Sequence, residues 1–149
     1  MDTKTQLNES VKDAMKSGDE LRKRTLRMVL AAVKQVEVDK QTTLDDMAVV
    51  ALIQKEIKNR REAIEEAKKA ERPDLIGDNE AEIKVLEVFL PKAMPAEELR
   101  ALVSAAIAET GAAGPSDMGK VMKIVMAKVA GRAPNDAVSA AVRELLQPK

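Results

Sequence analysis

Apolar residues recur at every third or fourth position along the chain, and this spacing predicts an all-α protein. A first helix is expected over residues 3–17, ended by Gly18, and a second helix from Asp19 to about Val38. The side chains expected to face the core from this pair are Leu7, Val11, Met15, Leu21, Met28, Val29, Ala32, Val33 and Val36.

A longer third helix is expected from residue 43 to about residue 70. Thr43 and Asp46 approximate a capping box at its start. Pro73 and Gly77 are expected to mark a break or a bend before a fourth helix. The apolar stripe of these two helices consists of Val50, Ile53, Ile57, Ile64, Ala67, Ile83, Leu86 and Leu90.

The segment FLPKAMP, residues 89–95, contains two prolines and is the clearest boundary in the chain. Each proline disfavours a helical conformation at the residue before it. The sequence therefore predicts two helical domains. Residues 1–94 are expected to form a bundle of about four helices, and residues 95–149 a bundle of three.

The middle helix of the second domain is expected to have Ser116 as its N-cap and to end at Gly131. The helices on either side of it are expected over residues 96–110 and about residues 136–146. The inward side chains of the three helices are Leu99, Leu102, Val103, Ala106, Ile107, Met118, Val121, Met122, Val125, Val129, Val138, Ala141, Val142 and Leu145.

A lysine-bearing face lies opposite the apolar face of this middle helix. At about 100° per residue, Lys120 and Lys123 point away from the core and Lys128 lies on the flank. Arg132 follows the end of the helix, and Ile124 is expected on the exposed side. Such a face suits phosphate oxygens rather than base edges, although an ordinary solubilising surface has the same pattern.

Formal net charge is zero, since 25 basic residues balance 25 acidic ones. Between residues 117 and 149, however, six basic residues stand against three acidic ones. The chain has no cysteine and no histidine, which excludes disulfides, thiolate nucleophiles and histidine bases. No catalytic residue or cofactor is expected. Carboxylates alone can also bind a metal, but no acidic cluster with the spacing of a metal-binding loop appears, so no metal site is expected. Phe89 is the single aromatic residue, so the stacking platforms of sequence-reading RNA binders are missing.

No membrane segment is expected, because the longest apolar run, residues 47–53, is too short to span a bilayer. The first ten residues lack the apolar stretch of a signal peptide. These features predict a cytoplasmic localisation.

Two charged stretches lie in the first domain. The second expected helix carries a cluster of cations that is either a solvated face or a second contact with nucleic acid: Arg22, Lys23, Arg24 and Arg27. The stretch KNRREAIEEAKKAER contains the adjacent carboxylates Glu65 and Glu66. Neighbours on a helix point about 100° apart, so a solvated face is expected there rather than an acid–base pair.

Several segments are similar, in order along the chain, to the GatB/YqeY family. They are RMV, KNRREAIEEAKKAERPDL and FLPK in the first domain, and IAETGA, DMGKVM and a K-V-x-G-R segment in the second. The resemblance covers nearly the whole chain. This sequence departs from the family pattern at Lys123, Ala127, Ala130 and Pro134-Asn135, where glycine, proline, lysine and Asp-Gly are usual.

The resemblance implies a function in tRNA recognition. In the amidotransferase B subunit, and on some glutaminyl-tRNA synthetases, the similar domain is a tail that grips the outer part of tRNA, while catalysis takes place elsewhere. The resemblance thus implies a non-catalytic tRNA-associated protein. It would carry an amidotransferase label by homology, as a carbon–nitrogen ligase with glutamine as amido-N donor.

The expected partners are tRNA and a tRNA-charging or amidotransferase assembly. Carried over position by position, the family motif gives the nucleic-acid-binding residues Gly119, Lys120, Lys128, Gly131 and Arg132, and the helical wheel adds Lys123. The alternative is a protein–protein adaptor without RNA binding, built on the helices of residues 1–90. A stand-alone amidotransferase ranks third.

Overall fold

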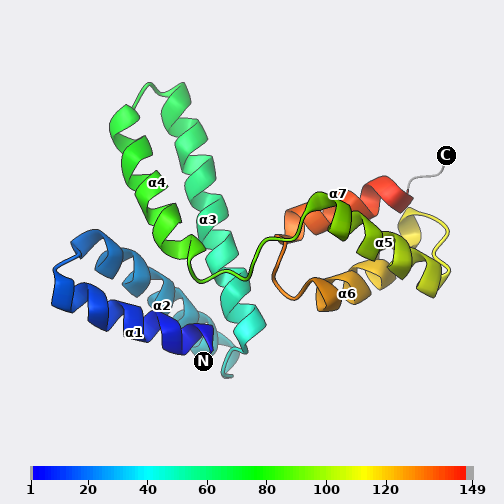
Figure 1. Cartoon of the computed structure of the whole chain (residues 1–149), viewed down its shortest axis with the longest axis horizontal. Coiled ribbons are helices and arrows are strands. Elements are labelled where there is room, and N and C mark those ends of the chain that lie inside the picture. Colours follow the sequence, from blue (N-terminus) through cyan, green and yellow to red (C-terminus); the bar gives the residue numbers. More distant parts are fainter. Residues whose placement is uncertain (1, 147–149) are drawn as a thin grey trace. The chain divides into compact units, whose positions relative to one another are not determined.

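The computed structural model describes residues 2–146, which form seven α-helices and one short 3₁₀ turn and contain no strand (Figure 1). The predicted all-α class is confirmed. The chain divides into two compact units, the first ending at Leu90 and the second beginning at Pro91.

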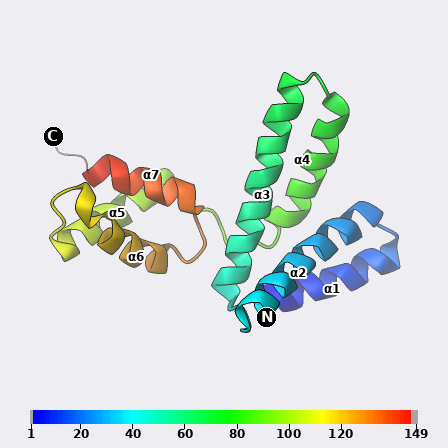
Figure 2. The same ribbon diagram turned by 180° about the vertical axis from the view of Figure 1, so that it is seen from behind.

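The first unit consists of two helical hairpins. Its helices are α1 (Thr3–Ser17), α2 (Glu20–Lys40), α3 (Asp46–Lys69) and α4 (Pro73–Glu87). Helix α1 packs along α2 and α3 along α4, while α2 also contacts both helices of the second hairpin. The hairpins meet near the α2–α3 connection and diverge towards their own turns (Figures 1 and 2).

Helix ends in this unit are fixed by aspartates and by backbone geometry. Asp45, rather than Thr43, caps α3, because its carboxylate accepts a hydrogen bond from the Ala48 amide at 2.8 Å. Glu71 takes a left-handed conformation (φ 56°) between α3 and α4, and Pro73 begins α4, where no amide hydrogen is needed. The expected break before the fourth helix therefore lies ahead of Pro73, and Gly77 lies inside α4.

The core of the first unit contains most of the apolar side chains that periodicity placed there, among them Leu7, Leu26, Val29, Ile53 and Leu86. Two methionines differ from the expectation, because Met15 and Met28 are 54% and 49% exposed. On α2 the buried positions Leu26, Val29 and Val33 already form the face towards the core, which leaves Met28 outside it.

One arginine of the charged stretch on α3 is buried. The Arg60 side chain is only 7% exposed, and its guanidinium bridges Glu56 at 2.8 Å and Glu82 of α4 at 2.9 Å. Sequence periodicity assigned this stretch to a solvated face, but a guanidinium with two carboxylate partners tolerates burial. The pair Arg60–Glu82 therefore ties α3 to α4.

A second polar junction fixes α1 to the α2–α3 connection. Glu37 accepts hydrogen bonds from Lys4 Nζ and from the Leu44 amide, each at 2.8 Å. The Thr3 amide donates to Asp46 of α3 at 2.6 Å. The hydrogen bond from Lys4 has the largest effect and that from the Leu44 amide the next largest. Together these donors hold the pKa of Glu37 below its ordinary value of 4.5.

The second unit is a three-helix bundle made of α5 (Ala96–Thr110), α6 (Met118–Val129) and α7 (Asn135–Leu146), with the 3₁₀ turn Pro115–Asp117 before α6. Val103, Val121 and Val125 lie at its centre with no exposed surface. Leu146, rather than the expected Leu145, closes the core. The Met94 amide donates to the Arg132 carbonyl at 2.9 Å, so the unit begins before the border predicted at residue 95.

Arg60→Ala is expected to lower the free energy of unfolding by about 3 kcal/mol, because it leaves Glu82 half-buried without its best partner. Arg61→Ala is the matched control, since the neighbouring side chain is 64% exposed and its contact with Glu87 is long, at 3.5 Å. It should change stability by less than about 0.5 kcal/mol. Urea unfolding measures both, and equal losses would contradict the assignment of the bridge to Arg60.

Glu37→Gln is expected to reduce stability in a pH-dependent way. The folded-state pKa of Glu37 is lowered, so its stabilising contribution is present above pH 4.5 and is lost as the pH falls through the folded value. The difference in unfolding free energy between wild type and Glu37→Gln should therefore shrink as the pH falls below 4.5. Lys4→Ala should show the same trend. A difference that stays constant with pH would refute this origin.

Candidate nucleic-acid interface

The start of α6 differs from the expected cap. Ser116 lies inside the 3₁₀ turn, and α6 begins at Met118. Asp117 occupies the N-cap position, but its carboxylate accepts from the Ala113 amide at 3.1 Å and thereby closes the preceding loop. The backbone amides at this helix end receive no side-chain cap.

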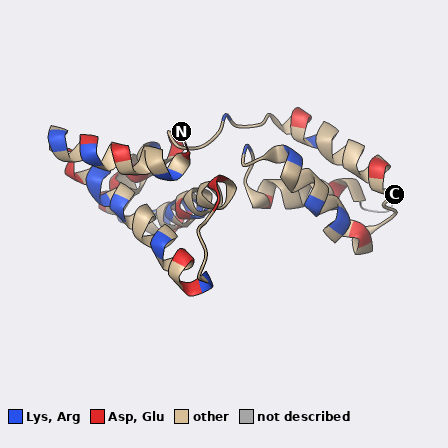
Figure 3. Ribbon diagram, turned by 90° about the horizontal axis from the view of Figure 1, so that it is seen from below, with Lys and Arg blue, Asp and Glu red and all other residues tan. Residues whose placement is uncertain are grey.

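Helix α6 separates its apolar and basic residues cleanly. Val121, Val125 and Val129 are fully buried, whereas Lys120 and Lys123 are exposed. Figure 3 shows basic positions following one another along this helix. Within residues 2–146, neither Lys120 nor Lys123 makes an ion pair or a side-chain hydrogen bond. Ile124 is half-buried against the core, so the expected exposed isoleucine is absent.

Lys128 lies apart from these two lysines on the flank of α6, as the helical spacing predicted. Its ammonium is 3.3 Å from Glu109 Oε2 at the end of α5. Both side chains are largely exposed, and an ion pair of this length in water contributes little free energy. A phosphate oxygen could therefore replace Glu109 at small cost.

Arg132 makes more side-chain hydrogen bonds than the other cations of the predicted set. Its guanidinium forms two hydrogen bonds with the Glu98 carboxylate, at 2.9 and 3.2 Å, and Nε donates to the Lys92 carbonyl at 3.1 Å. Arg132 thus fixes the segment before α5 and the first turn of α5 to the α6–α7 connection. Nothing in the sequence spacing paired Glu98 with a residue so distant along the chain.

The two predicted glycines occupy different conformations. Gly119 lies in the first turn of α6, is exposed, and would meet no atom within 4 Å if it carried a Cβ. Gly131 has φ of 79°, but Ala130 before it already has φ of 50° and ends the helix. The fold itself therefore needs glycine at residue 131 and does not need it at residue 119.

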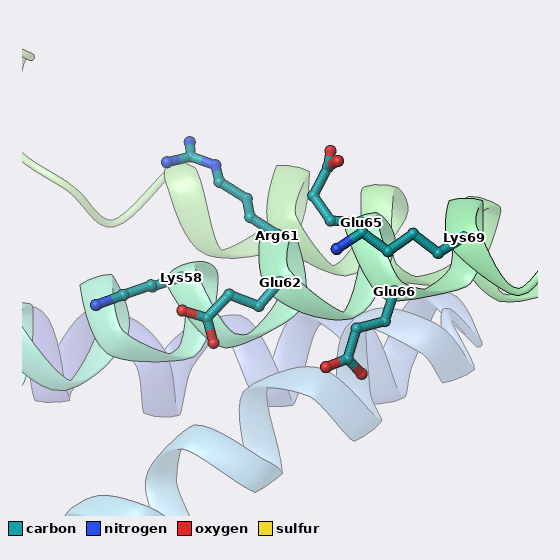
Figure 4. Close-up of a pocket in the computed structure, with 6 residues that line it drawn as sticks. All are labelled: Lys58, Arg61, Glu62, Glu65, Glu66 and Lys69. Carbon is teal, nitrogen blue, oxygen red and sulfur yellow. The ribbon is translucent and has the colours of Figure 1, made fainter.

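A shallow groove along α3 offers a different charge pattern. It is lined by Lys58, Arg61, Glu62, Glu65, Glu66 and Lys69 (Figure 4). Glu65 and Glu66 point to different sides of the helix, as their adjacency predicted. Three cations and three carboxylates line this groove, so it favours neither an anionic nor a cationic ligand.

The described part of the chain offers neither a metal centre nor a membrane span. Residues 2–146 contain no group of three or more histidine, cysteine, aspartate or glutamate side chains that could hold a metal ion. None of their helices combines the length and the apolar character needed to cross a membrane.

A family model described as Yqey-like protein matches residues 4–146. The chain is 37% identical over 120 residues to "Altered inheritance of mitochondria protein 41, mitochondrial" of Lachancea thermotolerans, which covers 78% of this chain and 64% of that protein. The protein of the same name from Vanderwaltozyma polyspora is 35% identical over 95 residues, which cover 61% of this chain and 51% of that protein. The protein of the same name from Pyrenophora tritici-repentis is 30% identical over 146 residues, which cover 96% of this chain and 80% of that protein.

These relatives also bear on length and localisation. The chain spans less than two thirds of the first two relatives and most of the third. All three relatives are named as mitochondrial proteins. The expectation of a cytoplasmic protein is wrong on this comparison.

Gly119→Ala and Gly111→Ala form a matched pair, because a Cβ at either position meets no atom within 4 Å. Gly119 is helical, so alanine there should raise the free energy of unfolding by up to about 1 kcal/mol. Gly111 ends α5 with φ of 67°, so alanine there should lower it by about 1 kcal/mol. Thermal unfolding of the full chain measures both. Shifts of the same sign would contradict a helical Gly119 and a left-handed Gly111.

Proposed function

The chain belongs to the Yqey-like protein family, and from this premise we propose that it binds the outer part of folded tRNA through α6 without itself catalysing a reaction. The match over residues 4–146 confirms the family resemblance of the sequence. The observation that carries the proposal is the exposed pair Lys120 and Lys123, which has no partner within the described chain.

The spacing of these lysines suits a phosphate backbone. Residues three apart are neighbours on a helix surface, so both ammonium groups can reach successive phosphates of one strand. Contacts of this kind position a protein on RNA through its shape and charge and do not require base-edge contacts. Gly119 beside them leaves the helix backbone open to close approach, and its lack of an internal role supports this use.

The other predicted residues have supporting roles in this proposal. Lys128 adds a third phosphate contact when its ion pair with Glu109 is replaced by one with a phosphate of the RNA. Arg132 and Gly131 shape the edge of the interface, because Arg132 is held by Glu98 and Gly131 forms the turn after α6. The amidotransferase label, with glutamine as amido-N donor, then describes an assembly that includes a separate catalytic partner. The lack of cysteine and histidine supports this division.

Lys120→Ala/Lys123→Ala is expected to weaken binding of total tRNA to the full chain, measured by fluorescence anisotropy over a salt titration. Each lost phosphate contact should reduce the slope of log K against log salt by roughly 0.7–0.9. Arg100→Ala/Arg143→Ala is the charge-matched control, since it removes two cations from α5 and α7 of the same unit. It should leave the salt slope almost unchanged.

The alternatives give different results in the same assay. Equal loss in both double variants would mean that net charge, and not the α6 face, governs binding. No binding of tRNA by the folded protein at low salt would refute direct recognition, and the adaptor alternative would then come first.

A further inference from the structure

A second surface with its own chemistry lies on the first unit. A shallow groove follows α2 over somewhat more than its first half, and it is lined by Glu20, Lys23, Arg24, Arg27, Met28 and Ala31. Three cations and one carboxylate give it a positive charge. The sequence pattern alone is compatible with two roles for these cations, a solvated face or a nucleic-acid contact.

The cations of the groove are poorly neutralised by the unit itself. Arg24 reaches Glu82 at 3.5 Å, but the other oxygen of Glu82 is already held by Arg60 at 2.9 Å. Lys23 pairs along its own helix with Glu20, which is well exposed. Arg27 has no carboxylate partner within residues 2–146, and its guanidinium donates a hydrogen bond to the Met15 sulfur at 3.6 Å.

Apolar side chains accompany these charges. Met28 lines the groove, and Met15 reaches Arg27 from α1, so two half-exposed methionines flank one unpaired guanidinium. Helical spacing predicted both methionines to be core residues. Exposed methionines form adaptable, polarisable contact surfaces, which proteins use to accept apolar side chains of a partner.

We propose that this groove docks an acidic amphipathic helix of a partner protein. Carboxylates of that helix would pair with Lys23, Arg24 and Arg27, and its apolar side chains would pack on Met28, Ala31 and Met15. Charge complementarity selects an acidic partner, and the mixture of arginine with methionine selects one that also carries apolar side chains. This docking site is independent of tRNA binding by α6.

Nucleic acid fits this surface less well than an acidic helix. Phosphates would use the three cations but give the methionines no role. Bases would need aromatic side chains for stacking, and the single aromatic residue, Phe89, is buried. The groove on α3 lacks the charge surplus altogether, because its cations and carboxylates are equal in number.

Methyl-labelled methionine gives a direct test on the full chain. The probe is a synthetic helical peptide with glutamates on one face and leucines on the adjacent face, and the control peptide has lysine in place of every glutamate. We expect the acidic peptide to shift the Met15 and Met28 methyl signals in the NMR spectrum. Met47, which is exposed on α3 but does not line the groove, should stay unchanged.

Variants separate the charged and apolar contributions. The double variant Arg24→Ala/Arg27→Ala and the single variant Met28→Ser should each lower the affinity for the acidic peptide by about tenfold or more. Arg61→Ala, which removes an exposed cation of α3, should leave its affinity unchanged. All of these positions are exposed, and the buried methyl signals of each variant report whether it is folded.

Three outcomes would overturn the proposal. They are the absence of any shift with the acidic peptide at low salt, equal binding of both peptides, and binding that survives Met28→Ser. Shifts of Met15 and Met28 caused by tRNA instead of the peptide would assign the groove to RNA. Failure of tRNA binding at α6 would appear separately, as unchanged Met118 and Met122 signals when tRNA is added.

Discussion

The guanidinium of Arg60, buried between α3 and α4, takes one oxygen of Glu82 at 2.9 Å and one of Glu56 at 2.8 Å. A buried charge of this kind is stable only with such partners, so Glu82 is needed to neutralise Arg60. Glu82 is the carboxylate of α4 that reaches α2, and its 3.5 Å contact with Arg24 neutralises that cation only in part. One internal ion pair thus ties α3 to α4 and also limits how far Glu82 neutralises the cations of α2.

The same rule operates in the second unit. Glu98 accepts two hydrogen bonds from Arg132, and Glu109 forms an ion pair with Lys128. These carboxylates therefore neutralise cations other than Lys120 and Lys123. Lys120 and Lys123 face solvent where no carboxylate of the described chain reaches them. A chain with zero net charge can therefore present unpaired cations in two places, because tertiary contacts and not composition decide which charges are neutralised.

Sequence reasoning succeeded where local rules decide the outcome. Helical spacing predicted the helices and most of the core, and the valines of α6 are buried as expected. It failed where distant contacts decide, because Arg60–Glu82 and Arg132–Glu98 join residues far apart in the sequence. Met15 and Met28 were assigned to the core because periodicity marks a helix face but does not show how far neighbouring helices cover it.

The two basic surfaces differ in the chemistry of their cations. Lysine is a compact, hydrated point charge that suits single phosphate oxygens, whereas arginine presents a planar fork that pairs with a carboxylate and packs against apolar groups. The resemblance to the family implies glycine at residue 123 and lysine at residue 130, whereas this chain has Lys123 on α6 and Ala130 at its C-cap. The charged side chain is thereby moved from the left-handed C-cap of α6 to its second turn, next to Lys120. Under the proposed function, the phosphate contacts are accordingly expected in the first two turns of α6, away from Arg132 and the turn that it stabilises.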